Sequence, residues 1–196
     1  MIAKKCVHIA LIPLPYLLLS LILSFLHYIF LPFVFLLLII QLFFIFFFRD
    51  PYRKIEDGIV SPADGIVMEN GEKVSIFMNL WNVHVNRMPI SGKILEVDHT
   101  AGRHSPAFRE KGENERLSIK IETEIGIVEV IQIAGMIARR IVPYVKKGDV
   151  AEKGEKIGIV RFGSKVEVYM PGNANINITV KKGDKIKAGQ TIGIYK

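Results

Sequence analysis

A run of 42 residues without a formal charge, from Val7 to Phe48, dominates the first quarter of the chain when its two histidines are counted as neutral. One helix needs about 20 apolar residues to cross the roughly 30 Å hydrocarbon layer of a bilayer, so this run is long enough for two passes. His27-Tyr28 and Pro32 lie near its middle and supply a turn. The run therefore predicts a membrane-embedded helical hairpin over residues 1–48.

Positive charge lies at both ends of this run, with Lys4 and Lys5 before it and Arg49, Arg53 and Lys54 after it. Because basic residues favour the cytoplasmic side, both ends of the hairpin are expected there. A secretory signal peptide is the alternative, but the run is too long and no small-residue cleavage site follows it. We expect the rest of the chain at the cytoplasmic face of the cell membrane.

The formal net charge of +7 and the sequence pI near 9.5 indicate an anionic partner, either nucleic acid or a lipid surface. The adjacent apolar run favours lipid, and the arginines are not interleaved with aromatic residues as in a single-strand binding groove. No nucleic-acid partner is expected. Cys6 is the single cysteine, so no intrachain disulfide can form. His99 and His104 have no cysteine partner near them, and no metal site is predicted.

Residues 49–57 form a charged, proline-broken linker, and the pattern then changes to short apolar runs separated by glycine, proline, asparagine and aspartate. Residues 58–196 are therefore expected to form a mainly β domain. The one candidate helix in it is Met78 to Val85. His99 to Arg116 is a polar stretch without a strand pattern, which is either a lid over an anionic headgroup or a solvated surface loop.

A repeat supports the β assignment. Lys146-Lys147-Gly148-Asp149, followed by Gly154 and Ile157-Gly158-Ile159, recurs 35 residues later as Lys181-Lys182-Gly183-Asp184 with Gly189 and Ile192-Gly193-Ile194. Each copy reads as strands joined by glycine turns. Such units resemble the barrel-sandwich fold of biotinyl and lipoyl carrier domains. The expected fold is an antiparallel β sandwich, closed or nearly closed, behind an N-terminal helical transmembrane hairpin.

Between the apolar run Ile157–Val160 and the alternating run Val166–Met170 lies the dipeptide Gly163-Ser164. Gly-Ser is ordinary turn chemistry by itself. A peptide bond held between two ordered strands, however, can be strained and fixed in one orientation. That arrangement is what a serine needs if its hydroxyl is to attack the carbonyl just before it.

The segment Arg161 to Pro171, RFGSKVEVYMP, resembles the self-cleaving segment of the short-form phosphatidylserine decarboxylases, including the archaeal branch thought to act on archaetidylserine. Four other segments match that family in the expected order, and together the five span about residues 49 to 196. They are Ser61–Gly65 (SPADG), Met78–Arg87 (MNLWNVHVNR), Glu113–Arg116 (ENER) and Gln132–Arg140 (QIAGMIARR).

The resemblance implies a carboxy-lyase that makes its own cofactor. Decarboxylating an amino acid leaves electrons on a carbon atom that no side chain can stabilise, and the sequence offers no evident site for pyridoxal phosphate. In the family, the serine attacks the preceding carbonyl and the chain splits, here into residues 1–163 and 164–196, which remain together as a heterodimer. Ser164 becomes a pyruvoyl group that forms a Schiff base with the phospholipid serine, releasing carbon dioxide and the ethanolamine lipid.

The resemblance also assigns roles to Asp64, tied to self-cleavage, and to His84, a proton donor or carboxylate partner in decarboxylation. Without it, Asp64 reads as part of an Asp-Gly turn and His84 as a half-buried strand residue. Longer family members have a second histidine where this chain has Arg87, which cannot act as a general base. Either His84 serves both steps or Asp64 acts more directly.

Four arginines are candidates to bind the lipid phosphate or the substrate carboxylate, because a guanidinium can bind either in bidentate fashion. They are Arg87, Arg139, Arg140 and Arg161. The pair 139–140 is equally well explained as a solvated turn. A homodimer and the ester or ether linkage of the lipid both stay open.

Two rival functions remain. A membrane-tethered carrier of biotinyl or lipoyl type would need an exposed lysine in Met-Lys-Met or Asp-Lys-Ala, and neither tripeptide occurs. A structural, membrane-tethered β domain without catalysis would keep its chain intact.

Overall fold

The computed structural model describes residues 1–102, 114–135, 140–161, 164–172 and 174–195. The chain forms two compact units, Met1–Pro51 and Tyr52–Lys196. We call the second unit the β domain.

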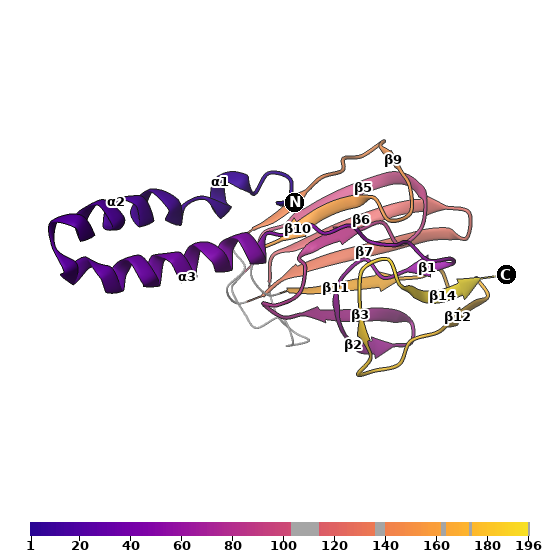
Figure 1. Ribbon diagram of the computed structural model, residues 1–196. Helices are drawn as coiled ribbons and strands as arrows, with labels where there is room; N and C mark the ends of the chain where they lie inside the picture. Colours follow the sequence, from indigo (N-terminus) through magenta and orange to yellow (C-terminus); the bar gives the residue numbers. More distant parts are fainter. Residues whose placement is uncertain (103–113, 136–139, 162–163, 173, 196) are drawn as a thin grey trace. The chain divides into compact units, whose positions relative to one another are not determined.

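The first unit is helical. It contains α1 (Val7–Ala10), α2 (Pro13–Leu26), the 3-10 helix η1 (Tyr28–Phe30) and α3 (Leu31–Phe47). The chain turns at His27, which ends α2 and whose Nδ1 accepts the Ile29 N–H at 3.2 Å. The predicted hairpin with a turn near His27 is confirmed (Figure 1).

Two 20-residue stretches of this unit, Val7–Leu26 and Tyr28–Phe47, are long and apolar enough to cross a membrane, with mean hydropathies of 2.4 and 2.9. Large apolar side chains on both helices are exposed, among them Ile22 and Ile39. The buried polar side chain of Gln41 in α3 donates from Nε2 to the Ala10 carbonyl at 2.8 Å. The Nε2 donor is thereby paired within the unit, whereas Gln41 Oε1 is buried without a partner among the described residues.

The β domain is built from antiparallel strands, which confirms the predicted fold class. Their bounds are β1 (Ile59–Val60), β2 (Gly65–Asn70), β3 (Lys73–Met78), β4 (Val85–Arg87), β5 (Gly92–Thr100), β6 (Arg116–Thr123), β7 (Gly126–Ala134), β8 (Ile141–Pro143), β9 (Val150–Ala151), β10 (Lys156–Val160), β11 (Ser164–Tyr169), β12 (Ile176–Ile178), β13 (Lys185–Ile186) and β14 (Thr191–Tyr195).

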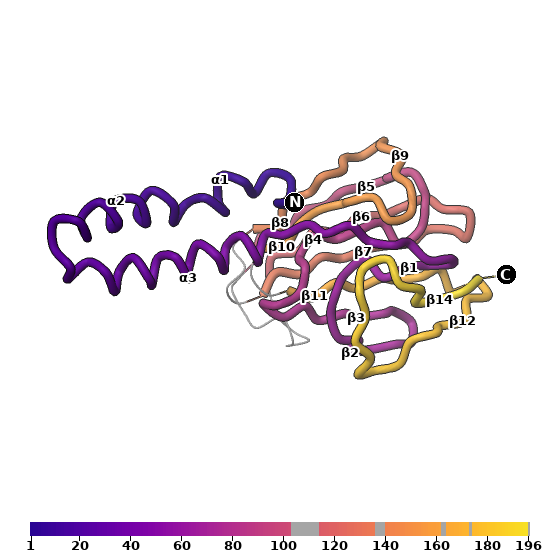
Figure 2. The backbone as a smooth tube through the Cα atoms, in the orientation of Figure 1, coloured from indigo at the N-terminus to yellow at the C-terminus, as the bar shows by residue number. Residues whose placement is uncertain are grey.

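Three sheets enclose one core. The largest has the strand order β13-β2-β3-β11-β7-β6-β5-β9, and the smaller ones have the orders β4-β10-β8 and β1-β14-β12. Figure 2 shows β4 and β8 beside β10. Buried residues of all three sheets join a single apolar cluster, for example Val166 of β11, Ile157 of β10 and Ile192 of β14. β11 lies inside the largest sheet, paired with β3 and β7.

The 35-residue repeat is a structural repeat. In each copy the aspartate Oδ2 accepts the N–H three residues before it, at 2.9 Å for Asp149 and 2.8 Å for Asp184. The preceding glycine has a positive φ, +92° at Gly148 and +96° at Gly183, which only glycine adopts without strain. The short strands β9 and β13 then pair with the equivalent strands β5 and β2.

The candidate helix from Met78 to Val85 does not form, so that prediction is wrong. β3 ends at Met78, a turn follows, and β4 begins at Val85. Asn79 and Asn82 explain the difference, because both side chains accept backbone N–H groups in the turn: Asn79 Oδ1 from Trp81 and Asn82 Oδ1 from Asn79, each at 2.9 Å. Such side-chain bonds stabilise turns in competition with helix.

Two other boundaries differ from expectation. Residues 52–57, expected in a linker, belong to the β domain, where the Glu56 N–H donates to the Gly189 carbonyl at 2.9 Å. The polar stretch from 99 to 116 carries strand at both ends, since β5 reaches Thr100 and β6 starts at Arg116. Residues 103–113 of this stretch, for which a lid and a solvated loop were both open, lie outside the described residues.

Candidate active site

Ser164 is the first residue of β11. Its Cα partners are Met78 at the end of β3 and Ala134 at the end of β7. Its side chain shares a face of β11 with those of Val166 and Val168, which both lie in the apolar core, so the hydroxyl lies on the core face of the sheet. Ser164 is fully buried, and its Oγ has no hydrogen-bond partner among the described residues. A buried hydroxyl without a hydrogen-bond partner lowers the stability of the fold, so its presence needs an explanation such as a chemical role.

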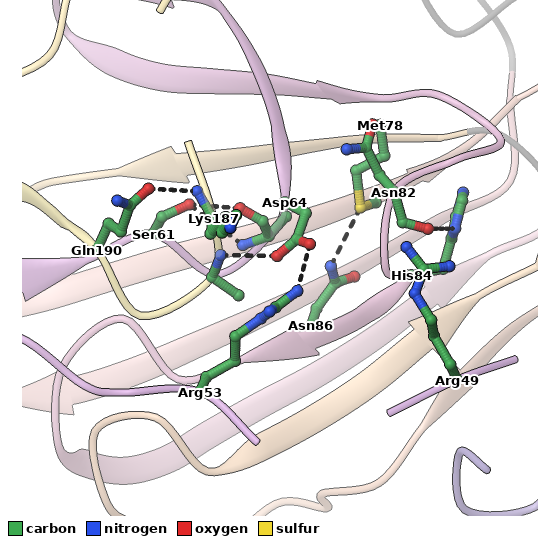
Figure 3. Close-up of polar contacts among 12 residues, drawn as sticks. Arg49, Arg53, Ser61, Asp64, Met78, Asn82, His84, Asn86, Lys187 and Gln190 are labelled. Atoms are coloured by element: carbon green, nitrogen blue, oxygen red, sulfur yellow. Dashed lines mark hydrogen bonds and ion pairs between the residues drawn. The ribbon is translucent and has the colours of Figure 1, made fainter. Parts of the chain in front are cut away.

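A turn positions His84, which is fully buried just before β4. Its Nδ1 lies 3.0 Å from the Asn82 carbonyl oxygen (Figure 3). Because a carbonyl only accepts, Nδ1 carries the proton in this contact, and Nε2 carries the lone pair of the neutral ring. The His84 carbonyl in turn accepts the Val160 N–H at 3.3 Å, which ties this turn to the end of β10, four residues before Ser164.

Asp64 is buried just before β2, and both of its carboxylate oxygens accept hydrogen bonds. Oδ1 accepts the Ala188 N–H at 2.9 Å, and Oδ2 accepts a hydrogen bond from Arg53 in an ion pair (Figure 3). The structure therefore brings Asp64 together with Arg53, whereas the Ser164 hydroxyl has no hydrogen bond to either Asp64 or His84.

The predicted arginines differ in their surroundings. Arg87 is buried, and its Nη1 donates to the Gly154 carbonyl at 3.0 Å. Arg140 is exposed and Arg161 is half-buried, and the two are joined by a backbone hydrogen bond from Arg161 N to the Arg140 carbonyl at 3.3 Å. Arg139 and Gly163, the other two predicted site residues, lie outside the described residues.

An ion cluster lies on the opposite face of β11 from Ser164. The Glu167 carboxylate contacts Lys165 Nζ at 2.8 Å, Lys73 Nζ at 3.0 Å and the Tyr169 hydroxyl at 3.1 Å. Burial opposes ionisation of Glu167, but the two ammonium groups outweigh it and hold the pKa of this carboxyl below its usual range. Burial likewise opposes charge on Lys73, yet its hydrogen bonds to Glu167 and Tyr169 raise the pKa of that ammonium.

Sequence reasoning missed two buried amides, Asn86 in β4 and Gln132 in β7. Gln132 Nε2 donates to Asn86 Oδ1 at 2.6 Å. The sequence did contain a clue to Gln132. Every second residue of β7 from Val128 on is buried, and Gln132 is the polar one in the series Val128, Val130, Gln132 and Ala134. Among the described residues, no group of three or more His, Cys, Asp and Glu side chains is placed to hold a metal ion.

The fold and site define an antiparallel β protein with two apolar N-terminal helices and a buried serine that heads an internal strand. Comparison with known proteins identifies its family. The phosphatidylserine decarboxylase family model matches residues 40–73 and 67–194. The chain belongs to this family, whose members are carboxy-lyases, and it is therefore an enzyme rather than a carrier or a structural domain.

Its relatives include bacterial and archaeal proteins. The phosphatidylserine decarboxylase proenzyme of Streptomyces avermitilis is 46% identical over 155 residues, which cover 75% of this chain and 71% of that protein. The corresponding proenzyme of Syntrophus aciditrophicus is 46% identical over 168 residues, with 76% and 78% covered. A provisionally named archaetidylserine decarboxylase proenzyme of Methanosarcina mazei is 50% identical over 153 residues, with 76% and 73% covered.

Proposed function

We propose that this enzyme removes the carboxylate of a phospholipid serine headgroup, using a pyruvoyl group made from Ser164 when the chain cleaves itself between residues 163 and 164. The substrate class is phosphatidylserine or archaetidylserine, the lipids for which its relatives are named. The word proenzyme in those names supports maturation by cleavage. The single observation that carries the proposal is the Ser164 hydroxyl, which is buried at the head of β11 and has no partner among the described residues.

The residues around Ser164 suit self-cleavage. Oγ attacks the carbonyl carbon of Gly163, the carbon–nitrogen bond breaks, and the hydroxyl proton passes to the nitrogen of residue 164, so the amide becomes an ester. A base then removes the Cα proton of residue 164, the Cβ–Oγ bond breaks, and Gly163 leaves as a carboxylate. The remaining enamine becomes an imine, and water converts it to a ketone with loss of ammonia. Burial on the core face keeps competing water from the ester.

The pyruvoyl ketone supplies the electron sink that side chains lack. His84 is proposed to deliver the proton that replaces the lost carboxylate, since an imidazole exchanges protons near neutral pH. Its contact with the Asn82 carbonyl fixes the ring, with Nε2 as the nitrogen that holds the exchanged proton. Asp64 is proposed to act in self-cleavage, where its carboxylate pairs with the Arg53 guanidinium.

Arg140 and Arg161, which are joined by a backbone hydrogen bond, are proposed to bind the anionic headgroup. Arg139, the neighbour of Arg140 in the sequence, is proposed to bind it with them. Arg87 is proposed to contribute positive charge to the same site while its guanidinium remains bonded to Gly154. Positive charge of this kind attracts both the phosphate and the carboxylate of the substrate.

We propose that α2 and α3 embed the protein in the cell membrane with the β domain on the cytoplasmic side. Their length and hydropathy suit two passes, and basic residues flank the pair at Lys4, Lys5 and Arg49. This location brings the enzyme to a headgroup without lifting acyl chains out of the bilayer, which costs about 0.8 kcal/mol for each methylene exposed.

Intact-mass analysis tests the proposal. The wild-type protein, purified from membranes, is expected as two pieces, 1–163 and 164–196, the second capped by a pyruvoyl group. Ser164→Ala should remain a single chain. Ser75→Ala, which changes another buried serine in the neighbouring strand β3, should cleave as wild type does. A folded wild-type protein that stays one 22.2 kDa chain would contradict the proposal.

A further inference from the structure

The proposed steps leave Asn86 and Gln132 without a role, although both are fully buried in the core of the β domain. A buried amide costs free energy unless its donors and acceptors are satisfied. The two side chains meet in one hydrogen bond, from Gln132 Nε2 to Asn86 Oδ1 at 2.6 Å. Gln132 Oε1 has no partner among the described residues. Burying this pair among apolar side chains therefore reduces the stability of the fold.

The hydrogen bond from Gln132 determines which way the Asn86 amide faces. Because Oδ1 is the accepting end, Nδ2 points away from Gln132 and donates to Met78 Sδ at 3.5 Å (Figure 3). A thioether sulfur is a weak acceptor. The two N–H groups of Asn86 Nδ2 thus retain most of their capacity to donate on the side of Met78.

Met78 links this donor to Ser164. The two residues are Cα partners in the antiparallel pair of β3 and β11, so their side chains leave the same face of the sheet with Cβ atoms about 5 Å apart. Met78 and Ser164 are both fully buried. The Asn86 donor therefore lies over the sheet face toward which the Ser164 hydroxyl points.

Gly158 provides the space for the Gln132 side chain. It lies opposite Asn86 in the pairing of β10 with β4. A Cβ built at residue 158 would come within 2.9 Å of Gln132 Oε1 and 3.1 Å of Nε2. The glycine lets Gln132 reach across the core to Asn86.

We propose that Asn86 donates a hydrogen bond to the Ser164 oxygen as that oxygen leaves Cβ, and that Gln132 is the positioning residue that aims Asn86. The inference rests on the proposed self-cleavage and assigns a donor to its second step. When the Cβ–Oγ bond breaks, its electron pair stays with the oxygen, which becomes one carboxylate oxygen of the 1–163 piece. A fixed N–H donor in a dry site stabilises such developing charge strongly.

The experiment follows cleavage of newly made full-length protein by intact mass. Asn86→Leu, a change of similar size, is expected to slow formation of the pyruvoyl piece about 100-fold. The ester formed in the first step should accumulate. Hydroxylamine splits an ester, so it should release a 164–196 piece that begins with an ordinary serine amine. Asn70→Leu is the matched control, because Asn70 donates to Val180 in another part of the domain and should mature at the wild-type rate.

Gln132→Glu tests the aiming role with Asn86 left in place. An ionised carboxylate cannot donate, so the Asn86 amide must reverse to donate to it, and its oxygen then faces Ser164. We expect the ester to accumulate at neutral pH and cleavage to recover as the pH is lowered and the new carboxyl is protonated. A residue that served packing alone would show no such pH dependence. This variant decides the question if Asn86→Leu fails to fold.

The outcomes separate the two proposals. If wild type does not cleave, the proposed function fails. If wild type and both folded variants mature alike and hydroxylamine releases no serine-headed piece, the role of Asn86 is overturned while self-cleavage stands.

Discussion

Asp64 and Ser91 occupy equivalent places in the two halves of the β domain. Each accepts a backbone N–H at 2.9 Å, Asp64 from Ala188 and Ser91 from Lys153, and the two donors are 35 residues apart, the period of the repeat. The same backbone hydrogen bond is thus accepted by an uncharged hydroxyl at Ser91 and by a carboxylate at Asp64. What is particular to Asp64 is its charge and its ion pair with Arg53.

Asp64→Ser should therefore separate the structural role of Asp64 from its chemical role. The serine hydroxyl can accept the Ala188 N–H, so this variant should be about 1 kcal/mol more stable than Asp64→Ala, which leaves that N–H unsatisfied. Thermal unfolding of both variants in the same detergent measures the difference. If the charge is needed for self-cleavage, both variants should remain uncleaved, and a fully matured Asp64→Ser would show that the carboxylate is structural.

His84→Asn should mature normally but decarboxylate slowly. The asparagine amide can still donate to the Asn82 carbonyl, so the turn is kept, while the exchangeable proton is lost. Decarboxylation should fall roughly 100-fold, the scale of general acid catalysis. Carbon dioxide release from vesicles that contain phosphatidylserine gives the rate, and intact mass reports maturation in the same sample. A variant that fails to cleave would instead assign His84 to both steps.

The ion cluster around Glu167 predicts a loss of stability in acid. The folded protein lowers the pKa of this carboxyl, so near its usual value of 4.5 the unfolded chain binds more protons than the folded one. The contribution of Glu167 to stability is present above pH 4.5 and is lost as the pH falls through the folded pKa. Glu167→Gln should lose about 1–2 kcal/mol at pH 7 and show a shallower decline below pH 4.5. Chemical unfolding at a series of pH values measures both, and parallel curves for the two proteins would contradict the assignment.

Trp81 can test whether the site lies at a membrane surface, as proposed. It is the single tryptophan, it is 67% exposed, and it lies in the turn three residues before His84. Tryptophan side chains prefer the headgroup level of a bilayer. In vesicles, its emission should be quenched more by lipids brominated near the headgroup than by lipids brominated at the chain ends. Trp81→Phe should abolish the emission. Quenching by aqueous acrylamide alone would show that this turn faces water.

Much of the architecture was predictable because it follows from local chemistry. The uncharged run predicted the helical pair, and the spaced Gly-Asp turns predicted a repeat whose copies share side-chain and backbone geometry at Asp149 and Asp184. The turn at Asn79–Asn82 was misread as helix, because the decisive contacts are two short-range side-chain bonds that apolar periodicity does not reveal.

The long-range polar contacts were beyond the sequence. Nothing in the local pattern pairs Arg53 with Asp64 or Gln132 with Asn86, since each pair is brought together by the packing of separate segments. The family resemblance supplied the candidate residues Ser164, His84 and Asp64. It did not supply their partners, which determine the tautomer of His84 and the charge environment of Asp64.

Because Ser164 lies at the very start of β11, the proposed cleavage would leave this strand whole. From this residue onward the strand is bonded on both edges, to β3 and to β7, so scission just before it severs none of those ladders. Separating the two products would require pulling an inner strand out of its sheet, which amounts to denaturation. Processing should therefore leave the hydrodynamic size in detergent unchanged and become visible only when the fold is melted.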